Sequence, residues 1–359
     1  TALPGQRKEF RVAVQNLEPT GGPVDVALDV PAGWTVSPAS TRLTVSVENE
    51  AMSARFFVTP PARPTAGAVT VGAVATRQGR TFRQTMQVIA YSHIQERHLL
   101  RPAMSTVKVI DVRVPRGLRV GYIMGAGDET AAAIAQLGAT VELLTPSDVA
   151  FGDLSRFTTI VLGIRAYESR GDVRGYHQRL LDFVRDGGHL VVQYNKNGMN
   201  QLGAGAGGAG AGGFSGMDMT GRGAAASSPY VPYPARITSN RVTVEQAPVT
   251  MLQAAHPLLT TPNRISAADF DGWVQERGLY FFGAADVRYT DLLKSADPWP
   301  YNAGDKTGLL TTTTVGRGTW TYVGLGLWRQ LPAGTPGAYR LLANLIAQPR
   351  AAGVARKGK

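Results

Sequence analysis

The sequence predicts a multi-domain fold in which an N-terminal immunoglobulin-like β-sandwich precedes an α/β doubly wound domain. Three observations support this prediction. A chain of 359 residues is long enough for two or three domains of about 100–200 residues each. Its first part alternates apolar and polar residues with a period of two. Its later part alternates continuous apolar runs with amphipathic stretches.

We place the sandwich at residues 1–92, a linker at 93–117 and the α/β domain at 118–349. The run GAGAGGAGAGG cannot pack a core, so residues 203–228 are expected to form a flexible glycine-rich insertion. Residues 350–359 are expected to form a basic disordered tail. Because strand-like sequence begins almost at Thr1, we also expect the chain to be part of a longer protein.

The sandwich is predicted from short strands separated by turn signals such as 18–22 and 60–64. The strand segments are EFRVAVQN, PVDVALDV, TRLTVSV, ARFFVTP, AVTVGAVAT and TFRQTMQVIA. No helical period interrupts them, which is typical of an immunoglobulin-like sandwich. Trp34 is most simply a core or turn residue there, with sugar stacking as the alternative.

The α/β domain is predicted from apolar strands that alternate with helices. The early strands are expected at 118–124, 140–144, 158–164 and 189–194, with helices at 128–137 and 175–185. Later strands are expected at 241–245, 278–282, 308–314 and 318–324, and a final helix from Thr335 to about residue 348. This alternation indicates a parallel sheet whose ligand crevice lies at the carboxyl ends of the strands.

Composition and charge exclude several classes of protein. The chain has no cysteine, which rules out disulfides, thiolate metal sites and a cysteine nucleophile. Its net charge is +11, but the long segment 118–349 carries only +1 and the excess lies mainly in the linker, the sandwich and the tail. A nucleic-acid binder needs cations clustered on one face, so nucleic acid is not an expected partner. No apolar run approaches the ~18 residues of a membrane span.

The turn from Gly125 to Asp128 stands where a dinucleotide-binding loop would stand. The third glycine of that motif is replaced by Thr130, and the acidic pair Asp128 and Glu129 would repel a pyrophosphate. We therefore expect a tight turn followed by a helix that Asp128 caps.

Two strand ends of the α/β domain offer candidate ligand-binding residues. The strand at 189–194 is followed by no competent nucleophile, and Gln193 and Asn195 either line a pocket or cap the strand end. Arg165 and Tyr167 directly follow the strand at 158–164, where crevice ligands are contacted in such sheets. Arg165 is otherwise an ordinary cation at the rim of the sheet.

The five histidines do not predict a metal site. His93 and His98 are five residues apart, whereas one helix face would need four. His177 and His189 are expected to be structural. His256 follows the apolar stretch MLQAA and could reach the rim of the sheet as a ligand contact, but no catalytic partner for it can be identified.

The densest polar cluster is DFDGWVQER at 269–277. Paired carboxylates beside an aromatic residue occur in glycoside hydrolysis and also in plain sugar binding, where Trp stacks on the ring. A structural loop with local salt bridges is the third interpretation. The binding candidates here are Asp271, Trp273 and Glu276, and Asp269 joins them in the catalytic alternative.

Several longer strings carry a resemblance to a known family. These are HIQERHLLRPA at 93–103, GYIMGAGDE at 121–129, GIRAYESR at 163–170, LLDFVRDGGHLVVQYN at 180–195, DFDGWVQERGLYF at 269–281 and LWRQLPAGTPGAYRLLANLI at 327–346. Together they resemble the C-terminal half of large bacterial PIG-L (LmbE-like) deacetylases. The sandwich resembles the domain associated with α-galactosidases. The α/β half is similar to flavodoxin-like class I glutamine amidotransferase domains and their trehalose-utilisation relatives.

The resemblance implies that catalysis lies elsewhere. Family members remove acetyl groups from N-acetylglucosamine-type substrates with an N-terminal zinc domain that carries an H-P-D-D-like motif. Here His256 and Pro257 are followed by two leucines, so no zinc ligand can be carried over. Asn195 lies about where the amidotransferase nucleophile would fall, which argues against amidotransferase activity.

The resulting hypothesis is a non-catalytic accessory region of a PIG-L-like deacetylase, with no cofactor of its own. It would bind a glycan or amino sugar, or support assembly with the catalytic deacetylase domain. The alternative is a hydrolase acting on carbohydrate derivatives through Asp269, Asp271 and Glu276, with His256 nearby. Homo-oligomerisation is a third role, since related amidotransferase-like domains trimerise some β-galactosidases. The sandwich resemblance favours a periplasmic or secreted location.

Overall fold

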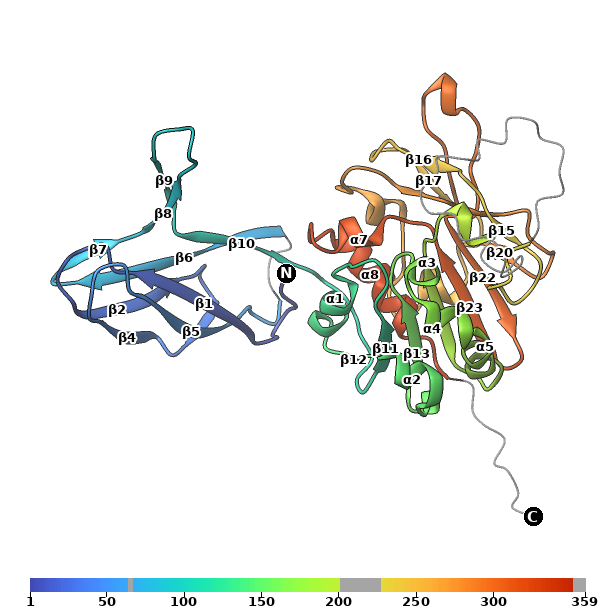
Figure 1. Ribbon diagram of the computed structural model, residues 1–359, viewed down its shortest axis with the longest axis horizontal. Coiled ribbons are helices and arrows are strands. Elements are labelled where there is room, and N and C mark those ends of the chain that lie inside the picture. Colours follow the sequence, from blue (N-terminus) through green and yellow to red (C-terminus); the bar gives the residue numbers. More distant parts are fainter. Residues whose placement is uncertain (64–66, 201–226, 351–359) are drawn as a thin grey trace, which may run out of the picture. The chain divides into compact units, whose positions relative to one another are not determined.

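The computed structural model describes residues 1–63, 67–200 and 227–350. The chain divides into two compact units, Thr1–Asp111 (unit 1) and Val112–Lys359 (unit 2), which Figure 1 shows. The described residues are rich in β-strands, which form several sheets, and the longest helix among them has 11 residues. In the described part of the chain, no helix is both long and apolar enough to cross a membrane.

Unit 1 is a β-sandwich, as the alternating sequence predicts. One sheet has the order β1 (Lys8–Gln15), β5 (Ala51–Thr59), β3 (Thr35–Ser37). The other has the order β10 (Met104–Val109), β6 (Gly67–Arg77), β2 (Gly22–Asp29), β4 (Ser40–Val45), with β7 (Arg80–Phe82) also paired to β6. Every second residue points inward, so Val26, Val45 and Phe56 are buried between the sheets.

The expected linker at 93–117 instead contains two strands of unit 1. β8 (Gln84–Ile89) and β9 (Arg97–Pro102) form a two-stranded hairpin, and β10 returns to pair with β6. β8 lies within the predicted strand TFRQTMQVIA, whereas β9 is mostly exposed and its sequence lacks the apolar alternation that marks a half-buried strand. β10 buries only Val107 and Val109, too few residues to give a clear pattern.

Unit 2 contains a seven-stranded sheet. Its order is β12 (Thr140–Leu143), β11 (Arg119–Ile123), β13 (Thr159–Leu162), β14 (His189–Gln193), β23 (Gly318–Val323), β22 (Leu310–Val315), β20 (Thr290–Asp291). The first four pairings are parallel, as the alternation of strands and helices predicts, and the last two are antiparallel. β13 and β14 are buried throughout, which explains their unbroken apolar sequence.

Helices pack on both faces of this sheet. α1 (Thr130–Gln136), α6 (Pro257–Thr260) and α8 (Pro336–Ile346) pack together, and α2 (Pro146–Phe151), α4 (Gly171–Gly175) and α5 (His177–Arg185) form a second group. The remaining elements are short: β15 (Arg236–Ile237), β16 (Arg241–Val242), β17 (Val249–Met251), β18 (Gly278–Leu279), β19 (Phe282–Gly283), β21 (Leu293–Ser295), α3 (Ala166–Ser169), α7 (Leu327–Gln330), and the 3-10 helices η1 (Leu154–Arg156), η2 (Asn197–Asn200), η3 (Ala267–Phe270) and η4 (Pro300–Asn302). Most of the predicted glycine-rich insertion and of the predicted tail lies outside the described residues.

His189 ties the sheet to α8. Its Nδ1 lies 2.9 Å from the carbonyl oxygen of Leu345, and its Nε2 lies 2.8 Å from the hydroxyl of Thr321. This pairing fits a neutral ring that donates from Nδ1 and accepts at Nε2. Burial lowers the pKa of His189 to about 4, because a charged imidazole would lose its hydration there.

This histidine should make folding sensitive to acid. Its folded-state pKa lies below its unfolded-state pKa. Its contribution to the free energy of unfolding is therefore fully present above about pH 6.5 and is lost as the pH falls towards 4. We expect His189→Gln to reduce the loss of unfolding free energy between pH 7.5 and 4.5 by on the order of 2 kcal/mol. Urea unfolding at the two pH values measures this. His93→Gln, at an exposed side chain, is the control, and an equal acid loss in wild type and His189→Gln would contradict the assignment.

Candidate functional site

The five parallel strands of unit 2 end at one edge of the sheet, which we call the carboxyl edge. The loops that follow four of these strands are 124–129 after β11, 163–165 after β13, 194–196 after β14 and 324–326 after β23. Ligands of such sheets bind at this edge. The predicted residues Arg165, Tyr167, Gln193 and Asn195 all lie on these strand ends or just after them.

Asn195 is fully buried, and its side chain is occupied by neighbouring protein groups. Its Oδ1 accepts a hydrogen bond from the backbone N–H of Tyr167 at 3.2 Å, and its Nδ2 donates to the carbonyl oxygen of Gln193 at 3.0 Å. Its backbone N–H donates to the hydroxyl of Tyr322 at 3.2 Å. Of the two roles expected for Asn195, the geometry therefore fits capping of the strand end rather than pocket lining.

Gln193 also faces the protein interior. Its Nε2 donates to the hydroxyl of Tyr122 at 3.2 Å, and the Tyr122 hydroxyl donates to Asp128 at 2.5 Å. The second Asp128 oxygen accepts from the backbone N–H of Ile164 at 3.1 Å, which joins the first loop to the end of β13. Helix α1 begins at Thr130, and its N-cap residue is Glu129. Asp128, which we expected to cap this helix, therefore lies one residue before the N-cap.

Tyr167 points away from the carboxyl edge. Its hydroxyl lies 2.8 Å from Nδ1 of His177, and its ring stacks on Tyr230 with centroids 5.0 Å apart. Burial raises the pKa of Tyr167 and lowers that of His177 to about 4. This residue is part of the core between β13 and α5, so it offers no surface to a ligand.

Arg165 remains accessible and begins a group of side chains that we call the edge cluster. Its guanidinium pairs with Glu168 at 2.9 Å, and Glu168 in turn accepts the backbone N–H of Lys196 at 2.5 Å. The ring of Tyr194 lies 4.2 Å from that of Trp328 and 6.0 Å from that of Tyr280, centroid to centroid. The cluster comprises Arg165, Glu168, Tyr194, Glu276, Tyr280, Trp328 and Arg329.

Glu276 reaches this cluster through Arg329. The two side chains form an ion pair at 2.8 Å, and Glu276 is only 13% exposed. Burial raises the pKa of Tyr194, while the nearby cations Arg165 and Arg329 lower it. The positive charges of both arginines therefore favour the ionised form of the Tyr194 hydroxyl.

Strained backbone marks the same place. Arg165 has φ 56°, Tyr280 has φ 54° and Gln275, beside Glu276, has φ 69°. A non-glycine residue in the left-handed region costs free energy and persists only where its surroundings hold it, commonly at binding sites. The loops at this edge are thus held in conformations that local preference alone would not give.

The predicted acidic cluster is divided among different partners. Asp269 forms a capping box with Ser266, the N-cap residue of η3. It also forms an ion pair with Arg340 on α8 at 3.1 Å. Asp271 is exposed. The expectation that Trp273 stacks on a sugar is not met, because its ring is 3% exposed and its Nε1 donates to the carbonyl of Asp269 at 2.9 Å. Of these residues, the contacts join only Glu276 to the edge cluster.

His256 does not reach the carboxyl edge either. It is the N-cap residue of α6, where its Nδ1 accepts the backbone N–H of Leu258 at 3.2 Å, and burial lowers its pKa. It lines a cavity of about 210 Å³ with threonines that include Thr319, at the start of β23. Among residues 1–63, 67–200 and 227–350, no three His, Asp or Glu side chains are grouped to hold a metal ion.

Sequence analysis did not identify Glu168, Tyr194, Tyr280, Trp328 and Arg329 as site residues. Tyr194 lies between the predicted residues Gln193 and Asn195, and Glu168 follows the predicted residue Tyr167. Their positions after buried strands could therefore have indicated a role at the carboxyl edge. Tyr280 lies between β18 and β19 and Trp328 in α7, and nothing local in the sequence shows that both contact Tyr194.

Comparison with known proteins supports the sandwich assignment. Residues 2–78 match a family model described as the NPCBM-associated, NEW3 domain of α-galactosidase. This confirms the expected resemblance to an α-galactosidase-associated domain, over well under half of the chain. A search of curated protein sequences found no match.

Similar solved structures include three bacterial proteins. A β-galactosidase from Rahnella sp. R3 is 17% identical, with 67% of this chain and 32% of that chain covered and a TM-score of 0.36. A cytoplasmic protein from Salmonella typhimurium LT2 is 12% identical, with coverages of 64% and 100% and a TM-score of 0.38. A ThuA-like protein from Bacteroides uniformis is 13% identical, with coverages of 67% and 96% and a TM-score of 0.38. The chain thus spans about a third of the length of the β-galactosidase.

Removing the Asn195 side chain should weaken the fold. Asn195→Ala would leave the Tyr167 N–H and the Gln193 carbonyl without this partner in a buried position. We expect a loss of about 2 kcal/mol in unfolding free energy. Urea unfolding of the full chain measures it, with Asn197→Ala at an exposed position as the matched control. Equal stabilities of the two variants would show that the Asn195 bonds contribute little.

Proposed function

We propose that this chain is a non-catalytic, carbohydrate-binding accessory region whose binding surface is the edge cluster of unit 2. The observation that carries the proposal is the group of aromatic rings, Tyr194, Tyr280 and Trp328, flanked by two ion pairs at the carboxyl edge. The α-galactosidase-associated model matched by unit 1 also supports a carbohydrate context.

The chemistry of the edge cluster suits a sugar. Tyr280 and Trp328 are partly exposed, and an apolar ring face can pack against the C–H face of a pyranose. Carboxylates such as Glu168 accept hydrogen bonds from sugar hydroxyls, and arginines donate to ring and acetyl oxygens. The pairing of Glu276 with Arg329 holds both groups in place before a ligand arrives. We propose glycans containing amino sugars as the ligand class.

The absence of catalysis is part of the proposal. A nucleophile in this kind of sheet would follow a central strand, and Asn195 occupies that position with its polar atoms committed to the protein. A glycoside hydrolase needs two carboxyl groups on either side of the bond that it cleaves. Asp269 and Glu276 are instead engaged by different arginines, Arg340 and Arg329.

The proposal also covers the domain type of unit 2 and the kind of protein to which the chain belongs. The parallel order β12, β11, β13, β14, β23 is the order of a flavodoxin-like sheet, and we propose that unit 2 is a class I amidotransferase-like domain that has lost its nucleophile. We further propose that the chain follows the catalytic domain of an extracytoplasmic PIG-L-like deacetylase. Unit 1 would then act as a spacer, and residues 118–349 as the amidotransferase-like domain. The strings at 93–103 and 269–281 support this proposal.

The binding proposal predicts that Trp328→Ala and Glu276→Gln each weaken affinity for N-acetylglucosamine oligomers by at least about tenfold, or ~1.4 kcal/mol. The physical reason is the loss of a stacking face in one variant and of a charged acceptor in the other. Isothermal titration calorimetry with the full chain measures the affinity, and thermal unfolding verifies that each variant is folded.

Trp299→Ala is the matched control. Trp299 is 43% exposed and stacks on Tyr301 outside the edge cluster, so its removal should leave affinity unchanged. An equal loss in the Trp299 and Trp328 variants would contradict the site. Wild-type affinity weaker than about 1 mM, near −4 kcal/mol, would contradict carbohydrate binding. Hydrolysis of a glycoside or acetamide by the purified chain, abolished in Glu276→Gln, would favour the hydrolase alternative.

A further inference from the structure

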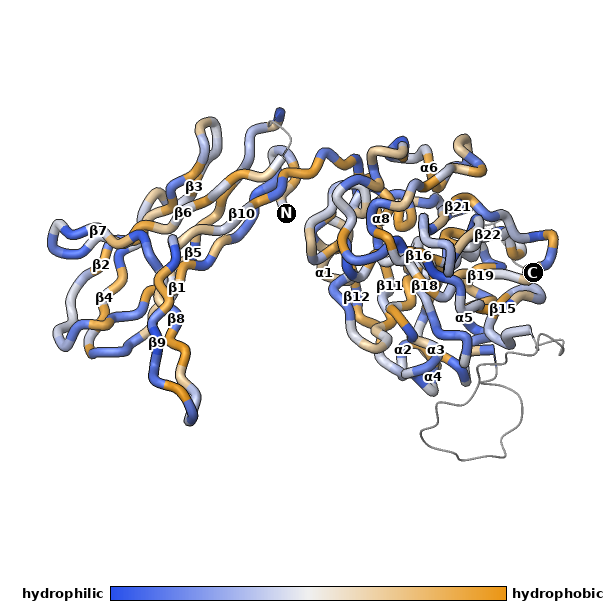
Figure 2. Tube along the Cα trace, turned by 90° about the horizontal axis from the view of Figure 1, so that it is seen from above, coloured by the Kyte–Doolittle hydropathy of each residue, from blue (hydrophilic) through white to orange (hydrophobic). Residues whose placement is uncertain are grey.

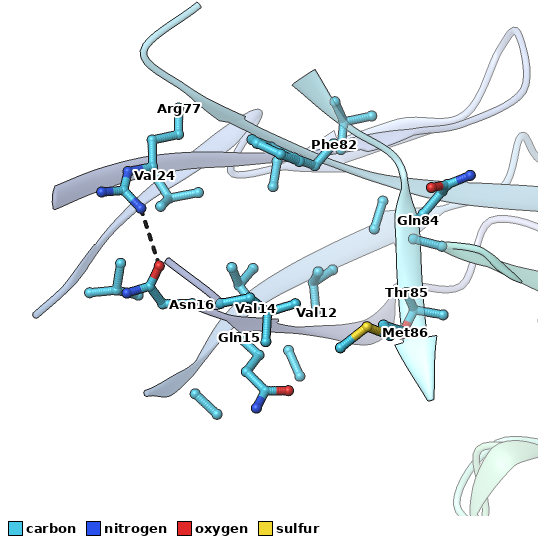
Figure 3. A pocket seen from close by; sticks show the side chains of 18 of the residues that line it. Val12, Val14, Gln15, Asn16, Val24, Arg77, Phe82, Gln84, Thr85 and Met86 are labelled. Carbon is cyan, nitrogen blue, oxygen red and sulfur yellow. Dashed lines mark hydrogen bonds between the residues drawn. The ribbon is translucent and has the colours of Figure 1, made fainter. Parts of the chain in front are cut away.

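The β-sandwich of unit 1 is open along one side. A groove of about 520 Å³ lies there, and Figure 3 shows the side chains of Val12 and Val14 from β1 on one wall and Met86 from β8 on another. Phe82 and Leu100 extend the apolar lining. With aliphatic side chains predominating, the groove suits an apolar polypeptide surface better than a sugar.

Both strands beside the groove have an unpaired edge. β1 pairs only with β5, and β8 pairs only with β9, in the described part of the chain. The inward-facing residues of β1 are only partly buried, unlike Phe56 and Val58 on the neighbouring β5. An edge strand with exposed backbone groups and apolar neighbours is a template for adding another strand.

The β8–β9 hairpin carries the complementary feature. It projects from the sandwich (Figure 1), and apolar stretches lie along it (Figure 2). Its register places Met86 opposite Leu100, so that Met86, Val88 and Leu100 share one face. Val88 is 48% exposed, Leu100 57% and, in the turn, Tyr91 64% and Ile94 44%. A two-stranded hairpin is only marginally stable in water, so these side chains favour a covering partner.

Charge favours a second copy of this chain as the partner. The hairpin carries Arg97 and Arg101, whereas Arg80 and Arg83, which precede it, already pair with Glu18 and Asp29 of the same chain. The opposite sign stands at one end of the groove, in the turn with Glu48 and Glu50, which is hydrogen-bonded to the lining residue Asn16. Arg97 and Arg101 lie on the other face of the hairpin from Val88, so they would remain at the rim of a docked complex. Rim charges of opposite sign steer association.

We propose that a second copy of this chain covers the groove. The hairpin of each copy docks against β1 of the other, with the face that contains Val88 turned into the groove and the arginines towards the acidic turns. Because each chain offers both a groove and a hairpin, the two contacts are equivalent and close a two-fold dimer. A second copy satisfies the unpaired strand edges, the exposed apolar face and the opposite charges together.

Sedimentation of the full chain tests the dimer. We expect a dimer at about 50 µM whose dissociation constant rises at least about tenfold in Val88→Glu, because a carboxylate would enter the apolar groove. Val287→Glu is the matched control, since Val287 is 98% exposed in unit 2, and it should leave the dimer intact. A monomer at about 100 µM, or a dimer that Val88→Glu leaves unchanged, would overturn the proposal.

Cross-linking keeps the proposal testable if Val88→Glu fails to fold. The chain has no cysteine, so Val14→Cys in one copy and Val88→Cys in a differently tagged copy provide the only thiols. We expect oxidation of the mixture to join the two tags, and no such product from Val14→Cys mixed with Val287→Cys. Equal yields from the two mixtures, or none from either, would overturn the docked geometry. A product that forms only after addition of a foreign peptide would assign the groove to another partner and also overturn the proposal.

Discussion

The arrangement of unit 2 depends on the hydrogen bonds of one buried amide, that of Asn195. Its side chain joins α3, which follows β13, to the end of β14, and its backbone N–H donates to the hydroxyl of Tyr322 on β23. Three neighbouring parallel strands thus meet through groups that must pair because they are hidden from water. The position where a sheet of this kind could present a reacting atom is used to close the edge of the sheet.

The edge cluster exists because these loops are fixed. Tyr194 follows β14 directly, and its ring packs on Trp328 from α7, the helix after β23. The ion pairs of Arg165 with Glu168 and of Glu276 with Arg329 then stand on either side of the aromatic rings. A preformed surface of this composition loses little conformational entropy when a ligand binds, which suits the proposed binding of a glycan. Unit 1 contrasts with it, since the edges of β1 and β8 beside its groove have no strand partner in the described part of the chain.

The strands and the parallel order of unit 2 could be predicted because β11, β13 and β14 are continuous apolar runs between amphipathic helices. The position of Arg165 followed from the same rule. Of the three interpretations of the cluster at 269–277, sugar stacking by Trp273 does not fit the structure, because η3 and Arg277 enclose its ring. Tyr280 and Trp328 could not be placed, since their contact with Tyr194 depends on long-range packing. The linker was misplaced because β9 and β10 bury too little surface to leave a periodic signal.

Carbohydrate binding at the carboxyl edge of the parallel sheet can be located by hydrogen–deuterium exchange. The exchange of the full chain is compared with and without about 10 mM N-acetylglucosamine oligomer. We expect slower exchange in the bound state for peptides covering 163–169, 194–197, 275–280 and 324–329, with no change at 266–271. Slowing confined to unit 1, or no slowing at any peptide, would contradict it.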